Sequence, residues 1–211
     1  MAITGCTGTL STVDPAGPAA GHIATLWWAM LIGSALIFAF VMGLIAAAFR
    51  RSGGGAGSIR LWIIGLGLVF PMAVLAILLA YGLIVGERLL PRKDDGVVSV
   101  RAEARMWSWS FSYDDAPGLV TENILHIPAG RPVDVSITTA DVIHSFWAPR
   151  LAGKLDAIPG HVNVLRIEAD LPGSYQGRSA EFSGDGYVGH RFVVIAHEPA
   201  EWEQLLAKGG K

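Results

Sequence analysis

The sequence predicts a membrane protein of mixed α+β class, in which a helical transmembrane hairpin precedes an all-β domain and a short C-terminal helix. Three observations predict this class. Hydrophobic residues make up 52% of the 211 residues and charged residues only 16%, which is too apolar for an ordinary soluble domain. Residues 23–49 and 61–86 form two long runs without a charged side chain. From residue 97 onward, short β-branched runs alternate with turn sequences.

Each uncharged run is long enough to cross a bilayer. As a helix it would extend roughly 39 Å, against a hydrocarbon core of about 30 Å. A buried hairpin in a soluble protein is the alternative, but both runs exceed the roughly 20 residues that one span needs. We therefore expect transmembrane helices at residues 22–50 and 61–86, with a mild kink near Pro71 in the second.

Arginines flank the connection between the two helices. Arg50, Arg51 and Arg60 lie around the sequence SGGGAGS, whereas residues 1–21 contain no Lys or Arg. The positive-inside rule then places residues 51–60 in the cytoplasm and both termini outside it. The remaining expected segments are an outer N-terminal stretch at 1–21, a linker at 87–96, an outer β-domain at 97–198, and a C-terminal helix and tail at 199–211.

The β-domain is expected to be an antiparallel sandwich or Greek-key barrel of about 100 residues. Its expected strands lie in VVSVRAEARMWSWSFSY, NILHIPAG, PVDVSITTA, NVLRIEADL and HRFVVIAHE. Its expected turns lie in DDAPG, PAGRP, IPGH, LPGS and SGDG. The final EPAEWEQLLAK has helical spacing, with Trp202, Leu205 and Leu206 on one face.

Charge and cysteine content exclude several classes of function. The net charge of -2 argues against a nucleic-acid partner, which needs a concentrated basic face. The single cysteine, Cys6, excludes an internal disulfide and a cysteine-rich metal site supplied by this chain alone.

Three motifs carry a resemblance to a known family. DVIHSFWAPRLAGKLDAIPG, residues 141–160, is similar to the stretch that carries the first copper-ligand histidine in subunit II of the haem–copper respiratory oxidases. MWSW, residues 106–109, resembles the aromatic segment through which that family accepts electrons, and SAEFSG, residues 179–184, lies where the family has a Cys-x-Glu-x-Cys-Gly loop. The resemblance covers most of the chain and implies a cupredoxin-like fold for the β-domain.

The resemblance also implies where the dinuclear copper A centre would be held. It places the two cysteines at Ser179 and Ser183, the two histidines at His144 and Tyr187, and the methionine at His190. Because serine hydroxyls do not ionise near neutral pH and cannot replace bridging thiolates, we expect no copper A. A mononuclear copper at His144 and His190 is the alternative, but blue copper needs a thiolate. Without metal, we expect hydrogen bonds within the loop to satisfy these histidines.

The loop is closest to that of the bo-type quinol oxidases, whose subunit II lacks copper A. This implies a subunit of an oxygen-reducing, proton-pumping ubiquinol oxidase in a bacterial cytoplasmic membrane, with the β-domain in the periplasm. The implied partners are subunit I, which would hold the haems, copper B and ubiquinol, then subunits III and IV and membrane lipid. This chain would hold no cofactor alone and no catalytic residue.

Two other functions stay open at this point. His144 and Glu181 are as in copper-bearing members, so the chain could belong to a variant cytochrome c oxidase that receives electrons through another subunit. A free-standing, membrane-anchored metal carrier or receptor is a more remote alternative, because it would not explain why the three motifs occur in the same order as in the oxidase family.

Four further residues have roles implied by the resemblance. Glu181 matches a glutamate that binds magnesium at the boundary with subunit I, with a solvated acid or a salt bridge as the alternative. Trp107 matches the electron-accepting tryptophan, although a packing role is favoured without copper. Ile64 replaces a glutamate near the cytoplasmic start of the second helix, so K-type proton uptake would need a substitute. Cys6, in the lipobox-like ITGC, is a candidate for lipidation that would require a start upstream.

Overall fold

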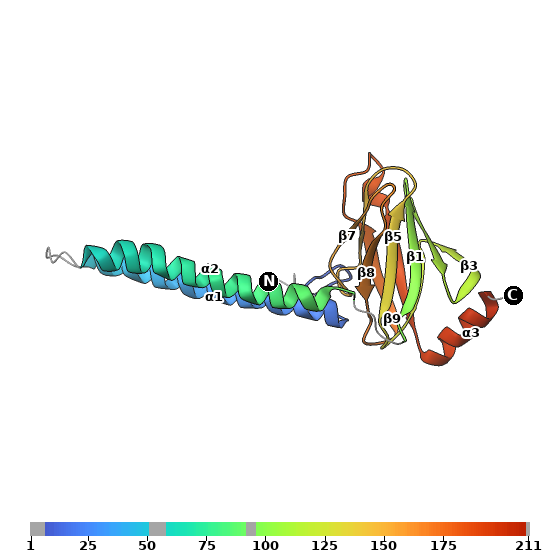
Figure 1. The fold of residues 1–211 in the computed structure, drawn as a ribbon, viewed down its shortest axis with the longest axis horizontal. Helices are drawn as coiled ribbons and strands as arrows, with labels where there is room; N and C mark the ends of the chain where they lie inside the picture. The colour runs from blue at the N-terminus through green and yellow to red at the C-terminus, as the bar shows by residue number, and fades with distance from the viewer. Residues whose placement is uncertain (1–6, 51–57, 92–95, 210–211) are drawn as a thin grey trace, which may run out of the picture. The chain divides into compact units, whose positions relative to one another are not determined.

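The computed structural model describes residues 7–50, 58–91 and 96–209 (Figure 1). The chain divides into two compact units, each described here by itself. One unit runs from Thr25 to Arg88, and the other combines the residues up to Ala24 with those from Leu89 onward.

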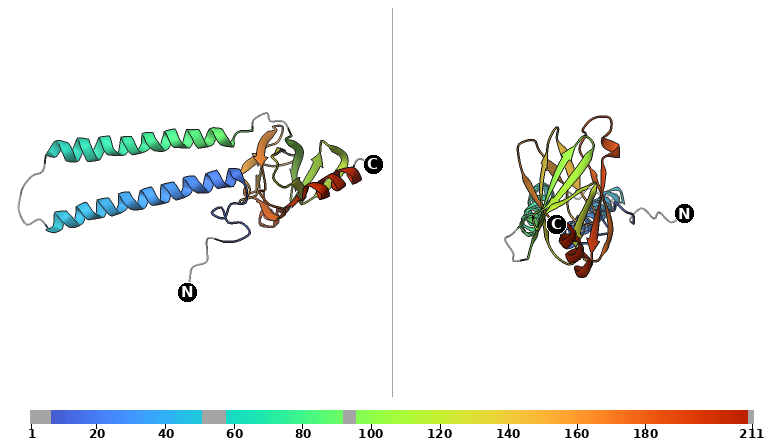
Figure 2. Two further views of the ribbon diagram at one scale, coloured as in Figure 1. Left: turned by 90° about the horizontal axis from the view of Figure 1, so that it is seen from below. Right: turned by 90° about the vertical axis from the view of Figure 1, so that its right-hand side faces the viewer.

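The first unit consists of two long apolar helices, as the sequence predicts. α1 spans Pro18–Arg50, and the second helix begins as a π-helix, η1 (Leu61–Val69), and continues as α2 (Phe70–Leu89). The helices run antiparallel (Figure 2), and the rings of Phe40 and Phe70 lie 6.2 Å apart. Both helices are long and apolar enough to cross a membrane. In each, the most apolar stretch of 18 residues has no residue buried within the chain.

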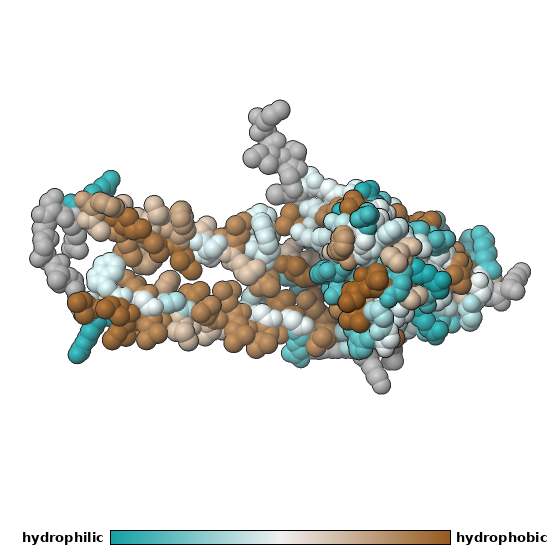
Figure 3. Space-filling view, turned by 90° about the horizontal axis from the view of Figure 1, so that it is seen from above, coloured by the Kyte–Doolittle hydropathy of each residue, from teal (hydrophilic) through white to brown (hydrophobic). Residues whose placement is uncertain are grey.

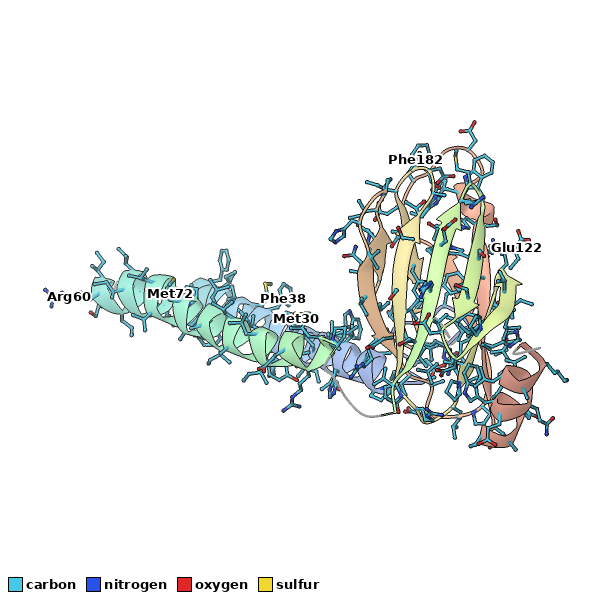
Figure 4. The ribbon with its side chains drawn as sticks, turned by 45° about the vertical axis from the view of Figure 1, so that its right-hand side comes forward. Met30, Phe38, Arg60, Met72, Glu122 and Phe182 are labelled. Atoms are coloured by element: carbon cyan, nitrogen blue, oxygen red, sulfur yellow. The ribbon has the colours of Figure 1, made fainter. Side chains whose placement is uncertain are left out.

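The surface of these helices is correspondingly apolar. Figure 3 shows hydrophobic residues along both helices, in contrast to the more polar surface of the β-domain. Met30, Phe38 and Met72 project from them in Figure 4 and are exposed. Apolar side chains exposed over such a length need a lipid or protein environment that this chain does not itself supply.

The second unit is a sandwich of two five-stranded sheets. The strands of the first sheet, in the order β3-β2-β1-β5-β8, are Ala116–Glu122, Ser108–Tyr113, Val98–Arg105, Val133–Thr139 and Asn163–Ile167. Those of the second sheet, in the order β4-β10-β9-β6-β7, are Ile124–Pro128, Arg191–His197, Gly173–Ser179, His144–Trp147 and Leu155–Ala157. A 3₁₀-helix, η2 (Tyr187–Gly189), precedes β10, and α3 (Pro199–Gly209) follows it.

The core between the sheets follows from the alternation of apolar residues along the strands. In β1 and β5 every second residue is buried, and these two strands pair in parallel. Because successive side chains of a strand point to opposite faces, this pattern gives each sheet one apolar face. Trp109, Phe111, Phe146 and Phe192 fill the centre, and all are at most 1% exposed. Trp202 of α3 is also buried, as its helical spacing predicts.

Several strands differ from the sequence prediction. The expected turn DDAPG is wrong in its second half, because β3 begins at Ala116 and includes Pro117 and Gly118. This strand lies at the edge of its sheet, where proline and glycine are tolerated. The short strands β6, β7 and β9 were not expected. β6 is buried at three successive residues and so lacks a period-two pattern, β7 has only three residues, and β9 contains glycine and serine in place of β-branched residues.

The N-terminal segment before the membrane belongs to the β-domain unit. The amide of Ala16 donates to the carbonyl of Arg150 at 2.7 Å, and the amide of Ala20 donates to that of Leu151 at 3.2 Å. The Arg150 side chain in turn forms an ion pair with Asp14 at 3.2 Å. α1 begins at Pro18, and its first turn is hydrogen-bonded to the β-domain.

Candidate functional site

The candidate site lies at one end of the sandwich, where β6 begins and where the loop between β9 and β10 returns. His144 is the first residue of β6 and is fully buried. Its Nε2 lies 2.8 Å from Oδ1 of Asp141, three residues earlier. Asp141 also accepts hydrogen bonds from the backbone amides of Met106 and Val142, at 2.7 and 2.6 Å.

These contacts determine the ionisation of Asp141. Partial burial raises its pKa, but the hydrogen bonds from His144, from the two amides and from Thr139 outweigh burial and lower the pKa to about 2. Asp141 is therefore a carboxylate and accepts the hydrogen bond of the His144 Nε2–H. The buried Nδ1 of His144 makes no hydrogen bond within the described residues.

His190, the residue before β10, is the second buried histidine of the site. Its ring stacks on Trp109 at 5.4 Å and stands at 89° to His144, with the two histidine centroids 4.8 Å apart. Burial and the neighbouring His144 lower the pKa of His190 to about 4, against smaller raising effects of the Ser108 backbone and Asp141. Its ring is therefore neutral at pH 7.

The expectation that loop hydrogen bonds satisfy both histidines is wrong. His144 has one hydrogen bond, to Asp141 outside the loop, while neither ring nitrogen of His190 has a hydrogen-bond partner in the described part of the chain. The rings of Trp109 and His144 lie against His190, and the nearby Ser108 backbone, which raises the pKa of His190, does not reach hydrogen-bond geometry with either ring nitrogen.

The two serines of the loop make different contacts. The hydroxyl of Ser179, the last residue of β9, accepts a hydrogen bond from the Ser145 amide at 3.1 Å, and its own amide donates to the His190 carbonyl at 2.9 Å. Ser183 is buried, and its hydroxyl makes no hydrogen bond to the described residues. Its carbonyl accepts from Nε1 of Trp107 at 3.1 Å.

Trp107 covers the loop that contains these serines. A Cβ added at Gly186 would lie only 2.4 Å from the Trp107 indole, so the ring rests directly on the glycine backbone. Tyr187, at the start of η2, packs its ring against Phe182 at 5.3 Å. Trp107 itself is 43% exposed, and Phe182 is exposed at the tip of the loop (Figure 4).

The residues present do not fit copper A. Four of the five matching positions, His144, Ser179, Ser183 and His190, lie buried in this end of the sandwich. Their donors are two imidazoles and two un-ionised hydroxyls, which cannot provide the bridging sulfur that a mixed-valence copper pair requires. Within residues 7–50, 58–91 and 96–209, no group of three or more His, Cys, Asp or Glu side chains gathers as a metal site.

Glu181 is paired within the chain. Its Oε1 contacts Nζ of Lys154, which also lies 3.8 Å from Asp156. The Glu181 hydrogen bond is the largest of the effects that raise the pKa of Lys154, so the ammonium is charged. Cys6, the candidate lipidation site, lies outside the described residues.

Sequence reasoning missed two residues that organise the site. Asp141 was part of the quoted motif, but its role as the acceptor for His144 and two backbone amides was not predicted. A signal existed, because an acid three residues before a buried histidine can reach its ring. Trp109 stacks on His190, and nothing in the sequence indicates that contact across 81 positions.

Known proteins resemble this chain in sequence and in the fold of the β-domain. The family described as cytochrome c oxidase subunit II, periplasmic domain, matches residues 115–198. Cytochrome c oxidase subunit 2 of Alkalihalophilus pseudofirmus is 32% identical over 219 residues, covering 95% of this chain and 63% of that protein. These matches support a resemblance of this chain to subunit II of the haem–copper oxidases. Quinol oxidase subunit 2 of Bacillus cereus is 36% identical, covering 52% of this chain and 37% of that protein.

A solved structure agrees on the fold of the β-domain. The periplasmic domain of subunit II of cytochrome oxidase from Bradyrhizobium japonicum has a TM-score of 0.53 and 24% identity, and the match covers 57% of this chain and 96% of that one. The expected pair of apolar N-terminal helices, the β-sandwich and the C-terminal helix are confirmed by the structure, and the solved domain agrees with the sandwich. The chain spans 63% of the length of the Alkalihalophilus pseudofirmus protein and 37% of that of the Bacillus cereus protein. The first is a cytochrome c oxidase subunit and the second a quinol oxidase subunit.

Together, the two apolar helices and the match to a periplasmic domain describe a membrane protein with a domain outside the cytoplasm.

Proposed function

We propose that the chain is subunit II of a proton-pumping, ubiquinol-oxidising terminal oxidase that reduces oxygen to water. The observation that carries this proposal is the presence of Ser179 and Ser183 in place of the two copper A thiolates. Without them the chain offers no external relay for electrons, so a donor that reaches another subunit through the membrane is favoured. Quinol oxidase subunits among the relatives support the same choice.

In this proposal the chain contributes structure and docking, and not redox chemistry. Subunit I would hold the haems, copper B and the quinol, and subunits III and IV would complete the complex. The exposed apolar surfaces of α1 and α2 would face subunit I and lipid in a bacterial cytoplasmic membrane. The connection at residues 51–60 would lie in the cytoplasm and the β-domain, residues 97–198, in the periplasm.

At the proposed magnesium site, the Glu181 side chain already has a cationic partner in the structure. Lys154 already neutralises the carboxylate, so a magnesium ion at the subunit I boundary would have to displace that ammonium. Magnesium needs oxygen ligands and keeps several waters, so subunit I would supply the others. Manganese resonance of the complex tests this, because Glu181→Gln should weaken manganese binding while Glu122→Gln, an exposed acid on β3, should not (Figure 4).

The purified complex provides the test of the main proposal. Ubiquinol oxidation should be rapid and unaffected by Trp107→Phe, and metal analysis should find no copper pair with near-infrared mixed-valence absorption. A chain with Ser179→Cys and Ser183→Cys should still lack that absorption, because Tyr187 and His190 stand at two other ligand positions.

A variant cytochrome c oxidase is the second candidate, favoured by the pairing of the buried His144 with Asp141 and by Trp107 packed on the loop. Rapid oxidation of cytochrome c that collapses in Trp107→Phe would establish this candidate and overturn the quinol proposal.

A further inference from the structure

A second histidine pair lies at the other end of the second sheet, away from the loop at Ser179–His190. His126 is in β4 and His197 is the last residue of β10. The two strands pair in parallel, with His126 opposite Ile195 and His197 opposite Pro128. Backbone hydrogen bonds of the sheet therefore fix the positions from which the two rings approach each other.

The two rings meet nitrogen to nitrogen. Nδ1 of His126 lies 2.8 Å from Nε2 of His197, and the ring centroids are 5.0 Å apart. The distance between the centroids exceeds the distance between the nitrogens by about the sum of two ring radii. The two nitrogens therefore lie close to the line that joins the ring centroids. This is the geometry of a nearly linear N–H···N hydrogen bond, which requires one proton between the two nitrogens and no more.

A carboxylate faces the far side of the pair. Nδ1 of His197 lies 3.5 Å from Oε2 of Glu201, one turn into α3. α3 is held in place by Trp202, which is 2% exposed and packs against Tyr113 at 6.1 Å. The described contacts thus form a row from Glu201 through His197 to His126.

Glu198 directly follows His197 in the chain, and the other contacts described for the pair are with uncharged groups. From β2, the Tyr113 hydroxyl accepts a hydrogen bond from the His126 amide at 2.8 Å, and burial raises the pKa of Tyr113, so it is neutral. From β3, Thr121 bonds that hydroxyl at 3.3 Å. From β9, the residues paired with the end of β10 are Ser174 and Gly173.

We propose that His126, His197 and Glu201 form a one-proton binding site on the β-domain. Before uptake, Nδ1–H of His126 donates to Nε2 of His197, and His197 carries its own proton on Nδ1, 3.5 Å from Glu201. The incoming proton binds Nε2 of His126, and the shared proton passes to Nε2 of His197. His197 is then an imidazolium between the Glu201 carboxylate and a neutral His126, and no bond other than these N–H bonds changes.

The site stops at one proton for an electrostatic reason. A second proton would place two positive rings with facing N–H groups 2.8 Å apart and destroy the hydrogen bond between them. Consistent with this, burial and the charge of His197 both lower the pKa of His126. The pair therefore behaves as one acid–base group with two rings.

Counting protons by nuclear magnetic resonance tests the proposal. With 15N-labelled histidine in the full chain in detergent micelles, the wild-type pair should take up one proton between pH 8 and pH 5.5. His126→Phe should leave that count at one, because His197 remains. Two protons in the wild type, falling to one in His126→Phe, would show independent rings and overturn the proposal. His190 provides the internal control and should stay neutral over this range.

A pair of glutamate variants tests the part played by the carboxylate. Glu201→Gln should lower the midpoint of uptake by about half a pH unit, or threefold in proton affinity, a small effect because Glu201 is exposed. Glu203→Gln, an equally exposed acid on α3, should leave the midpoint unchanged. Equal shifts in both variants would mean that only the general charge of α3 acts, and would remove Glu201 from the site. Dispersion of the Trp202 indole signal verifies that each variant is folded.

Discussion

The two histidine pairs of the β-domain have almost the same ring separation and opposite chemistry. His144 and His190 lie 4.8 Å apart with perpendicular rings, both fully buried, and His126 and His197 lie 5.0 Å apart and bond directly. In the first pair, Asp141 binds one ring and aromatic side chains surround the other. In the second, a shared hydrogen bond and Glu201 connect both rings.

The difference teaches that the distance between two histidines does not determine what they can do. A buried ring without partners resists protonation, because the charged form loses its hydration and gains nothing in return. A ring between an acceptor and a carboxylate can hold a proton. In the first pair, His190 is consequently a neutral ring of the core, and the second pair is the one that we propose to bind a proton.

The largest expected effect is the change of stability with pH that is caused by His190. Its folded pKa of about 4 lies below the unfolded value of 6.5, so its contribution to stability is present above pH 6.5 and is lost as the pH falls towards 4. We expect the wild-type chain to lose about 3 kcal/mol from this source between pH 7 and pH 4. Urea unfolding followed by tryptophan fluorescence measures it.

His190→Phe should remove this pH response while keeping the contact with Trp109. His161→Phe, at an exposed position, should retain it. An identical pH dependence in wild type and His190→Phe would contradict the assignment of a neutral, buried ring.

The next effect concerns the acceptor of the first pair. Asp141→Asn should lower the free energy of unfolding by about 2 kcal/mol at pH 7, because the carboxylate accepts charge-assisted hydrogen bonds from two amides and from His144. Asp115→Asn, an exposed acid in the β2–β3 turn, should cost less than about 0.5 kcal/mol. Equal costs in the two variants would show that Asp141 does not organise the site.

A smaller effect tests how the Trp107 ring packs on the loop at Gly186. Gly186→Ala places a methyl group against the Trp107 ring and should cost about 1 to 2 kcal/mol, with a change in indole fluorescence. Gly189→Ala, three residues on, meets no atom within 4 Å and should leave the fluorescence unchanged. If Gly186→Ala is silent, Trp107 does not rest on the loop.

The smallest effect concerns the second pair. Tyr113→Phe removes the hydroxyl that accepts from the His126 amide and should cost about 1 kcal/mol in unfolding free energy. Tyr187→Phe is the matched control, because its hydroxyl has no hydrogen bond among the described residues. Similar costs in both variants would show that the Tyr113 hydroxyl does not support β4.

The parts of this fold that the sequence predicts depend on local pattern. The two membrane helices follow from uncharged runs, and α3 follows from the spacing of Trp202, Leu205 and Leu206. β3 was missed because Pro117 and Gly118 are typical of turns, and only its place at a sheet edge makes them acceptable in a strand.

The same limit applies to the sites. Ser179, Ser183 and His144 could be aligned with metal-ligand positions because they lie within recognisable motifs. His126 and His197 are 71 residues apart and meet only because β4 pairs in parallel with β10, a nonlocal pairing that no local motif encodes. The Lys154 contact with Glu181, 27 residues away, was hidden for the same reason.

The N-terminal segment has a consequence for how the chain could be divided. Ala16 and Ala20 are hydrogen-bonded to Arg150 and Leu151, so the first turn of α1 is part of the β-domain although two membrane helices separate them in sequence. A chain cut between the helices would therefore give two fragments with a built-in means of recognising each other. The N-terminal fragment would carry one half of that interface into the membrane, and the fragment that begins with the second helix would carry the other, as in a split-protein reporter.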